Sequence, residues 1–174
     1  NMPIQIHKDV LDVGFIDRVD KWSRTQEKLS TNLNVWPDGV VGVSGPILLY
    51  RLEGELKDEL LKQIEDKIPK QIRFESTKFT YTLGSRFSYI PWHDDHCYVF
   101  SMTIYLNKIW DRDWAGMFVY EDGDEIKAIY PEFNKAVSFI PPLNHSTCMP
   151  NINAPLRQTI QLFFSSEPEN QNDA

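Results

Sequence analysis

The chain has 174 residues, a formal net charge of −7, and 41% hydrophobic and 25% charged residues. This length predicts a single domain whose core needs no cross-links, and two cysteines are too few for a disulfide scaffold. The acidic charge argues against non-specific nucleic-acid binding. No apolar run reaches membrane-spanning length, and the N-terminal residues lack a signal-peptide pattern. We therefore expect no membrane or nucleic-acid partner and a cytoplasmic location.

The first seventy residues predict helical packing. Phe15, Val19 and Trp22 recur near helical spacing and predict a helix over residues 10–29. Repeated Pro and Gly residues between 32 and 46 indicate a loop.

A short apolar run over residues 47–52 is typical of an edge strand. A second helix is predicted over 53–68, and Pro69 ends it. Its apolar positions step by four: Leu56, Leu60, Ile64 and Ile68. Both helices are expected to cover one face of a sheet.

Residues after Pro69 predict short strands rich in β-branched and aromatic residues. The expected strands cover 72–83, 96–106, 117–120, 126–130, 135–140, 145–149 and 157–165, and residues 85–92 are a loop or strand edge. Asp122-Gly123 is a strong hairpin signal. Together these patterns predict one domain over 1–174, mainly β with flanking N-terminal helices. Helical packing spans 8–70, a jelly-roll core 71–166 and a frayed tail 167–174.

The candidate chemistry is carried by two of the four histidines and one aspartate. His93 and Asp95 are two residues apart, so on an extended strand their side chains share a face. Taken alone, His93 is better explained as a hydrogen-bonded surface or loop histidine, and Asp95 as part of a solvated turn. With His145 they make two imidazoles and one carboxylate, a ligand set that leaves open positions on Fe(II).

Arg157 opens the apolar strand RQTIQLFFS, which should be largely buried. A buried guanidinium needs an anion, because leaving it unpaired costs about 3–5 kcal/mol. That anion is either a protein carboxylate or a bound one, and a planar guanidinium fits a carboxylate through two hydrogen bonds. Thr159 shares the strand face and would add a hydroxyl donor.

Several motifs in fixed order resemble the prolyl 4-hydroxylase-like branch of the Fe(II)/2-oxoglutarate-dependent oxygenases. They are Tyr81-x-x-Gly84, PWHDD, TIYLN, the segment 110–116, PEFN, His145 and RQTIQLFF, and they span about residues 79–164. The resemblance implies a double-stranded β-helix, a cupin-like jelly roll, with iron on His93, Asp95 and His145.

The resemblance also implies the cosubstrate site. Arg157 would bind the C5 carboxylate of 2-oxoglutarate, helped by the Tyr81 hydroxyl, and Ile104 stands where some relatives have a tyrosine that contacts 2-oxoglutarate. Such enzymes use O2 to convert 2-oxoglutarate to succinate while oxidising a substrate, with ascorbate as a candidate reductant. The carboxylate at Asp95 favours hydroxylation over halogenation. The expected substrate is peptidyl proline or another amino-acid-like molecule.

Two other functions use the same residues differently. A non-oxygenase metal-binding cupin, an isomerase or hydrolase, would keep the triad and pair Arg157 internally. A jelly-roll binding module without metal would bind through exposed aromatic residues. The candidate rim residues, which fit packing as well as substrate contact, are Arg86, Tyr89, Trp92, His96, Trp110 and Trp114.

Overall fold

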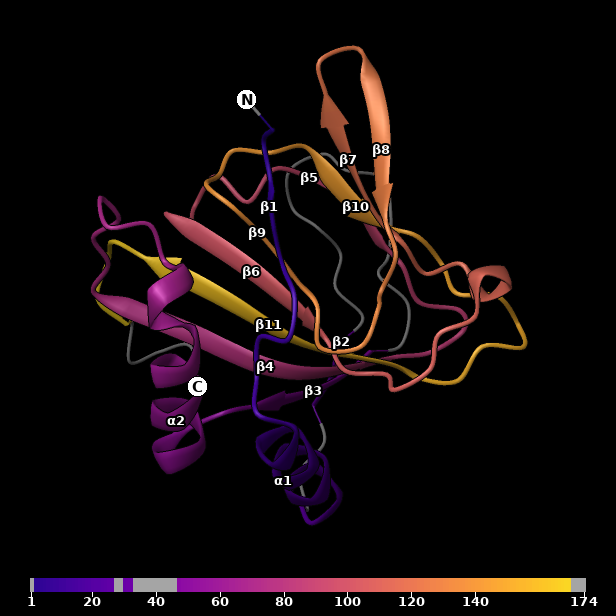
Figure 1. Ribbon diagram of the computed structural model, residues 1–174, viewed down its shortest axis with the longest axis horizontal. Coiled ribbons are helices and arrows are strands. Elements are labelled where there is room, and N and C mark those ends of the chain that lie inside the picture. Colours follow the sequence, from indigo (N-terminus) through magenta and orange to yellow (C-terminus); the bar gives the residue numbers. More distant parts are fainter. Residues whose placement is uncertain (1, 27–29, 33–46, 170–174) are drawn as a thin grey trace.

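A computed structural model describes residues 2–26, 30–32 and 47–169 and contains two antiparallel sheets (Figure 1). The large sheet has the order β1-β9-β6-β11-β4-β3-β2, and the small sheet has the order β5-β10-β7-β8. Strands of the large sheet are β1 (Gln5–His7), β2 (Ser30–Asn32), β3 (Ile47–Arg51), β4 (Ser76–Gly84), β6 (Phe100–Tyr105), β9 (Ala136–Phe139) and β11 (Arg157–Ser165). Strands of the small sheet are β5 (Ile90–His93), β7 (Phe118–Asp122), β8 (Glu125–Ile129) and β10 (His145–Thr147).

From β4 onward the chain crosses repeatedly between the two sheets. Strands β4, β6, β9 and β11 lie in the large sheet, and the strands between them lie in the small one. This arrangement confirms the predicted double-stranded β-helix. It places the ends of β5 and β10 opposite the inner face of the large sheet, where a site can form between the layers.

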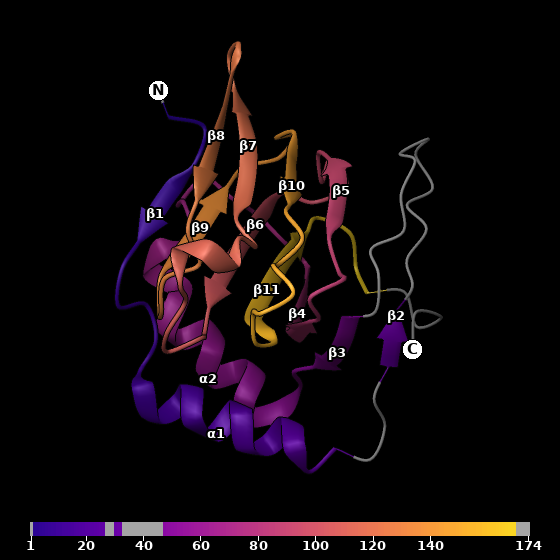
Figure 2. The same ribbon diagram turned by 90° about the vertical axis from the view of Figure 1, so that its right-hand side faces the viewer.

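Two helices, α1 (Val13–Arg24) and α2 (Gly54–Ile64), cover the outer face of the large sheet (Figure 2). Their apolar stripes pack against strand residues of β3, β4, β6 and β11 in one continuous core. Asp12 caps α1 by accepting a hydrogen bond from the backbone N–H of Phe15 at 3.0 Å. Short 3₁₀ turns follow α2 (Glu65–Lys67) and precede β7 (Arg112–Trp114). Neither described helix has the length and apolarity to cross a bilayer.

A second, smaller core lies between the sheets. It joins side chains of the large sheet to side chains of β7 and of the segment before β10: Ile4, Tyr105, Phe118, Tyr120, Val137, Phe139 and Leu143. This core therefore holds the two layers together beside the site.

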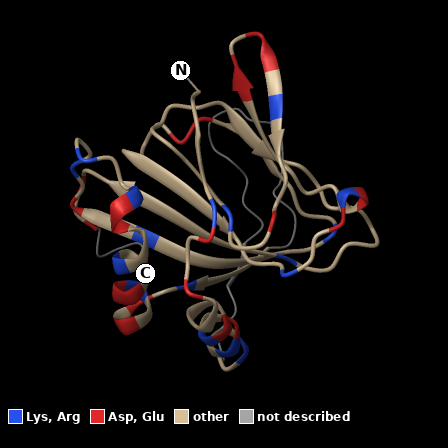
Figure 3. Ribbon diagram, viewed as in Figure 1, with Lys and Arg blue, Asp and Glu red and all other residues tan. Residues whose placement is uncertain are grey.

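Charged residues gather outside these cores. They lie on the two helices and near the tip of the projecting β7–β8 hairpin, whereas the central strands carry few (Figure 3). The two-residue connection of this hairpin begins at Gly123, which adopts φ 64°, so the hairpin signal is confirmed one residue further along than expected.

Several expected element boundaries need correction. Helix α1 covers 13–24 rather than 10–29, and residues 27–29 of that prediction lie outside the described residues. The 47–52 strand is not an edge, because β2 pairs with its outer side. The predicted loop from 33 to 46 and the tail from 170 also fall outside the described residues. The predicted β11 limits, 157–165, are confirmed.

Candidate metal centre

Two neighbouring strands of the small sheet bring the candidate ligands together. β5 and β10 pair antiparallel, and His93 lies directly opposite His145 in their register. Asp95 follows two residues after His93, beyond the end of β5, where its backbone adopts φ 56°. The carboxylate therefore reaches the histidines through a left-handed turn and not through the strand alternation that the sequence predicted.

The three side chains converge on one point. Their ligand atoms all lie within 4.8 Å of one another. The Nε2 atom of His93 is 3.3 Å from Oδ1 of Asp95, and Nε2 of His145 is 3.4 Å from Oδ2. The arrangement matches two imidazoles and one carboxylate that share a cation, leaving further positions open.

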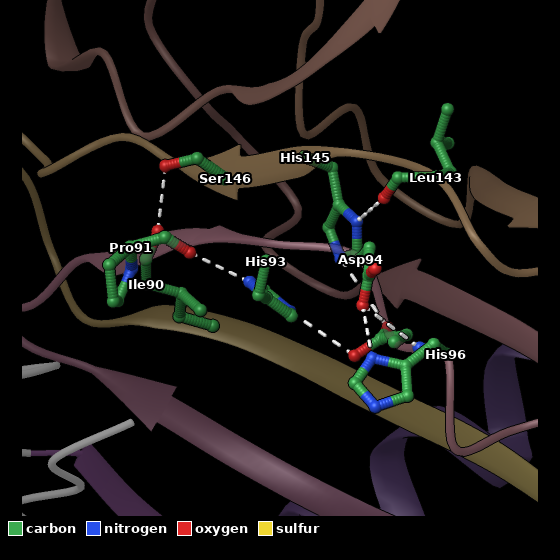
Figure 4. Close-up of polar contacts among 9 residues, drawn as sticks. Ile90, Pro91, His93, Asp94, His96, Leu143, His145 and Ser146 are labelled. Atoms are coloured by element: carbon green, nitrogen blue, oxygen red, sulfur yellow. Dashed lines mark hydrogen bonds and ion pairs between the residues drawn. The ribbon is translucent and has the colours of Figure 1, made fainter. Parts of the chain in front are cut away.

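Backbone carbonyls fix the orientation of both rings (Figure 4). Nδ1 of His93 is 2.7 Å from the carbonyl oxygen of Pro91, and Nδ1 of His145 is 2.6 Å from that of Leu143. A carbonyl can only accept, so each Nδ1 carries the proton and donates. This leaves each Nε2 directed at Asp95, available as a metal ligand once deprotonated.

Burial and mutual attraction shape the protonation of this group. Burial raises the pKa of Asp95, but the hydrogen bonds and charges of His145 and His93 outweigh it, so the pKa falls well below the usual range. Burial opposes charge on His93, yet the bond to Asp95 and its charge raise the pKa of that imidazole. Asp95 is thus an anion at neutral pH, as a metal ligand must be.

The triad lines a cavity of about 240 Å³ between the two sheets. The large sheet contributes polar side chains to its wall, including Thr80, Thr103 and Gln161. Phe118 and Phe139 shield His145, with ring centroids 5.2 and 4.8 Å from the imidazole. The wall beside His145 is therefore apolar, and the wall that the large sheet forms can make hydrogen bonds.

Arg157 lines a smaller pocket that is adjacent to this cavity. The two spaces share Thr82, Thr147 and Gln161 in their walls. The Arg157 side chain is buried, and its Nε donates to the Gly116 carbonyl oxygen at 2.9 Å. Burial lowers its pKa, and none of the described carboxylates pairs with the guanidinium.

Buried hydroxyls near Arg157 also have no partner. The guanidinium carbon is 5.3 Å from the centre of the Tyr105 ring. Hydroxyl oxygens of Tyr105, Thr159 and Thr82 are buried without a hydrogen bond among the described residues. Burial raises the pKa of Tyr105 to about 12, so its phenol stays protonated and can donate. A guanidinium without a carboxylate partner, beside three hydroxyls without a hydrogen bond in the described part of the chain, fits a bound carboxylate.

Tyr81 was wrongly predicted to assist at this pocket. Its ring belongs to the core beneath the helices, and its hydroxyl donates to Oδ1 of Asp20 at 3.2 Å. Burial, followed by the charge of Asp20, raises its pKa. Successive residues of β4 face opposite sides, so Thr80 and Thr82 face the cavity while Tyr81 faces α1.

The tyrosine that the sequence reasoning missed is Tyr105. Ile104 was expected at the tyrosine position of relatives, but Ile104 lies in the core beneath the helices. Tyr105 lies opposite Thr159 in the sheet, on the inner face. The alternation Ser101, Thr103, Tyr105 was the signal that could have revealed this.

Most of the candidate rim residues lie away from the cavity. Trp110 donates to the Ala115 carbonyl and packs on Trp114 behind Arg157, and Arg86 donates to the Ile152 carbonyl. His96 hydrogen-bonds to Asp94 on the exposed side of the turn. Tyr89 lines the pocket of Arg157. The rim instead includes Tyr98, whose ring stacks on Phe163 at 4.7 Å.

Comparison with known proteins gives a fold but no relative by sequence. No family model and no curated protein matches the chain. A prolyl-4-hydroxylase from Pseudomonas putida is similar, with a TM-score of 0.71 and 14% identity over 94% of this chain and 92% of that one.

Two further solved structures share this fold. A prolyl hydroxylase in complex with a hypoxia inducible factor peptide fragment from Trichoplax adhaerens aligns at TM-score 0.69 and 15% identity, over 94% of this chain and 84% of that one. HygX from Streptomyces hygroscopicus, with nickel and 2-oxoglutarate bound, aligns at a TM-score of 0.65 and 10% identity, over 94% of this chain and 83% of that one. The chain thus has the double-stranded β-helix fold seen in these enzymes.

Proposed function

We propose that this chain is an Fe(II)/2-oxoglutarate-dependent dioxygenase that hydroxylates a C–H bond of a peptide or amino-acid-like substrate. One observation carries the proposal. A His-Asp-His group fit for a divalent metal lines a cavity that shares wall residues with the pocket of a buried arginine, and no described carboxylate neutralises that arginine. The triad alone would also suit a hydrolase, and the arginine alone would also suit a purely structural role. Together they match a metal and a dicarboxylic keto acid.

In this proposal His93, Asp95 and His145 hold Fe(II) through Nε2, a carboxylate oxygen and Nε2. Arg157 binds the distal carboxylate of 2-oxoglutarate, and Tyr105 and Thr159 donate hydroxyl hydrogen bonds to it. When bound, iron and 2-oxoglutarate supply the oxygen-dependent chemistry that forms succinate and hydroxylates the substrate. Ascorbate would keep the iron reduced.

The residues of the chain bind, orient and exclude water. The carbonyls of Pro91 and Leu143 hold the two imidazoles in the ligand orientation. Phe118 and Phe139 keep water from the face of His145. The open side near Tyr98 and Phe163 is where the substrate would enter.

Peptidyl proline is the first substrate class to test. The reason is the shared fold with a prolyl-4-hydroxylase and with a prolyl hydroxylase in complex with a peptide fragment. At 14% and 15% identity these likenesses support the choice of probe only. The cytoplasmic location stays a prediction.

The deciding experiment measures succinate from 2-oxoglutarate with Fe(II), O2 and ascorbate, together with 2-oxoglutarate affinity for the Ni(II) form. Arg157→Ala should weaken 2-oxoglutarate binding at least about thirtyfold, because a buried charge pair loses one partner, while metal affinity stays unchanged. No succinate together with no 2-oxoglutarate binding would reject the proposal. Tight Zn(II) binding without 2-oxoglutarate binding would instead favour the isomerase or hydrolase alternative.

A further inference from the structure

The inner face of the large sheet presents its side chains to the site in four cross-strand rows. The rows follow the register of β4, β11 and β6. In order they are Gly84–Arg157, then Thr82–Thr159–Tyr105, then Thr80–Gln161–Thr103, and finally Lys78–Phe163–Ser101. Arg157 is thus at one end of the face and Lys78 at the other.

The two cationic rows are far apart. Lys78 lies six residues before Gly84 on β4, so the outer rows are separated by about 20 Å of strand. The guanidinium of Arg157 is held near its own row by the Gly116 carbonyl and the Tyr105 ring. The carboxylates of a five-carbon keto acid are only roughly 5 Å apart. One such molecule could not bridge Arg157 and Lys78 along the sheet.

Lys78 is exposed at the end of the cavity wall that also holds the triad, and it has no carboxylate partner among the described residues. The carboxylate of Asp95, also in the wall, lies between the two histidines. Beside Lys78, on the neighbouring strand, Phe163 stacks against Tyr98 with an interplanar angle of 27°. A lysine in the cavity wall, directly opposite Phe163 in the strand register, suits a ligand with an anionic group on a hydrocarbon body.

We propose that Lys78 is a specificity-determining residue that binds a carboxylate of the primary substrate. This inference rests on the proposed function. There, one carboxylate of 2-oxoglutarate binds Arg157 and the other end binds the metal, so the cosubstrate leaves no anion for Lys78. The substrate places its hydrocarbon part over Phe163 and Tyr98, with the carbon to be oxidised toward the metal. The carboxylate belongs either to the oxidised residue or to its neighbour in a peptide.

The test uses the full chain saturated with Ni(II) and 2-oxoglutarate, and isothermal titration calorimetry. Each acidic probe is paired with its uncharged amide: Ac-Glu-NH2 with Ac-Gln-NH2, and Ac-Pro-Glu-NH2 with Ac-Pro-Gln-NH2. The first pair places the acid on the oxidised residue, and the second places it on the neighbour of a proline. We expect at least one acidic probe to bind about tenfold more tightly than its amide, as one charge-assisted hydrogen bond would give.

Variants assign that preference to Lys78. Lys78→Met should abolish it, Lys78→Arg should retain it, and Lys70→Met, at an exposed position in a turn, should leave it unchanged. A preference that persists in Lys78→Met would arise from another group of the site and would overturn the inference. Equal binding of acids and amides, or no binding of any acidic probe, would also overturn it.

The same titrations separate this inference from the proposed function. If the wild-type protein fails to bind 2-oxoglutarate, the proposed function itself fails. If 2-oxoglutarate binds but Lys78→Met weakens it as strongly as Arg157→Ala does, Lys78 belongs to the cosubstrate site and the inference is wrong. Weakened acid binding with an unchanged 2-oxoglutarate dissociation constant supports it.

Discussion

Tyr105 and Tyr81 have the same side chain in neighbouring parts of one sheet but opposite surroundings. The Tyr105 hydroxyl is buried on the inner face with no partner in the described ranges of the chain, whereas the Tyr81 hydroxyl donates to Asp20 on the helix side. Which face a residue occupies therefore decides which tyrosine can serve a ligand. The Tyr81-x-x-Gly84 motif that suggested Tyr81 does not show on which face of the sheet its side chain lies.

Replacing each tyrosine by phenylalanine should separate their roles. Tyr105→Phe should weaken 2-oxoglutarate binding to the Ni(II) form about tenfold, because a donor to a carboxylate is lost. It should not lower the free energy of unfolding, since it removes a buried hydroxyl that none of the described residues hydrogen-bonds. Calorimetry and urea unfolding measure the two effects.

Tyr81→Phe is the matched control and should affect stability but not 2-oxoglutarate binding. We expect unchanged 2-oxoglutarate affinity and a loss of about 1 kcal/mol in unfolding free energy, because the bond to Asp20 disappears. A tenfold loss of 2-oxoglutarate affinity in Tyr81→Phe would contradict the facing assigned to β4.

Gly116 holds Arg157 in place and has room for no side chain. Its φ is 69°, and an added Cβ would lie 2.9 Å from Cζ2 of Trp110 and 3.5 Å from Cδ of Arg157. Gly116→Ala should lower the unfolding free energy by about 1–3 kcal/mol through strain and weaken 2-oxoglutarate binding by displacing the carbonyl that Arg157 contacts. Thermal unfolding and calorimetry test both effects.

Gly123→Ala is the control for backbone strain alone. Gly123 has φ 64° but nothing within 4 Å of an added Cβ. Its substitution should destabilise the hairpin without changing 2-oxoglutarate affinity. Equal losses of affinity in both variants would remove the special role of Gly116.

At the scale of elements, α1 depends on a defined N-terminal cap. Asp12 accepts from the Phe15 N–H, and α1 then buries Phe15, Ile16 and Val19. Asp12→Ala should lower the unfolding free energy by about 1 kcal/mol, whereas Asp12→Asn, which can still cap, should cost less. Urea unfolding provides the measurement. If Asp12→Asn lowered the unfolding free energy as much as Asp12→Ala does, the charge of Asp12 and not its capping hydrogen bond would stabilise the helix.

Elements with strong periodicity could be predicted from the sequence, and others could not. β11 alternates inner and outer residues over its full length, so its limits and the burial of Arg157 followed directly. β5 contains Pro91 and has only four residues, too short to show alternation. β3 looked like an edge because its outer neighbour β2, with three residues and no apolar pattern, gives no sequence signal.

The site itself was partly predictable for the same reason. Residue types identified His93, Asp95, His145 and Arg157, because few other residues can hold a metal or a dicarboxylate. The left-handed turn at Asp95 was not predictable. Asp95 lies two residues beyond the end of β5, and the sequence does not show whether the chain there continues as a strand or turns. The facing of Tyr105 could have been inferred from the polar alternation of Ser101 and Thr103 along β6, and the pairing of β6 with β11 shows it.

At the scale of the whole molecule, metal and cosubstrate should stabilise the fold by mass action. Ligand at about 100 times its dissociation constant adds about 2.7 kcal/mol, which for a chain of this size raises Tm by roughly 5–10 °C. We expect this shift with Ni(II) and 2-oxoglutarate together in differential scanning fluorimetry, with EDTA reversing it. His145→Ala should show almost none of it. A shift from 2-oxoglutarate alone, without metal, would contradict the joint site.

His93 and His145 belong to the four-stranded sheet and Asp95 follows its strand β5, whereas Arg157, Thr159 and Tyr105 belong to the seven-stranded sheet. The gap between these two layers is set by the aromatic side chains of Phe118, Tyr120 and Phe139. Of these three, Tyr120 is not in the wall of the cavity, so shortening it would change the distance between the two layers without removing a proposed metal or cosubstrate contact. Under the proposed function such a protein should still bind the metal but fit 2-oxoglutarate poorly, so activity can be lost at a position that contacts neither ligand.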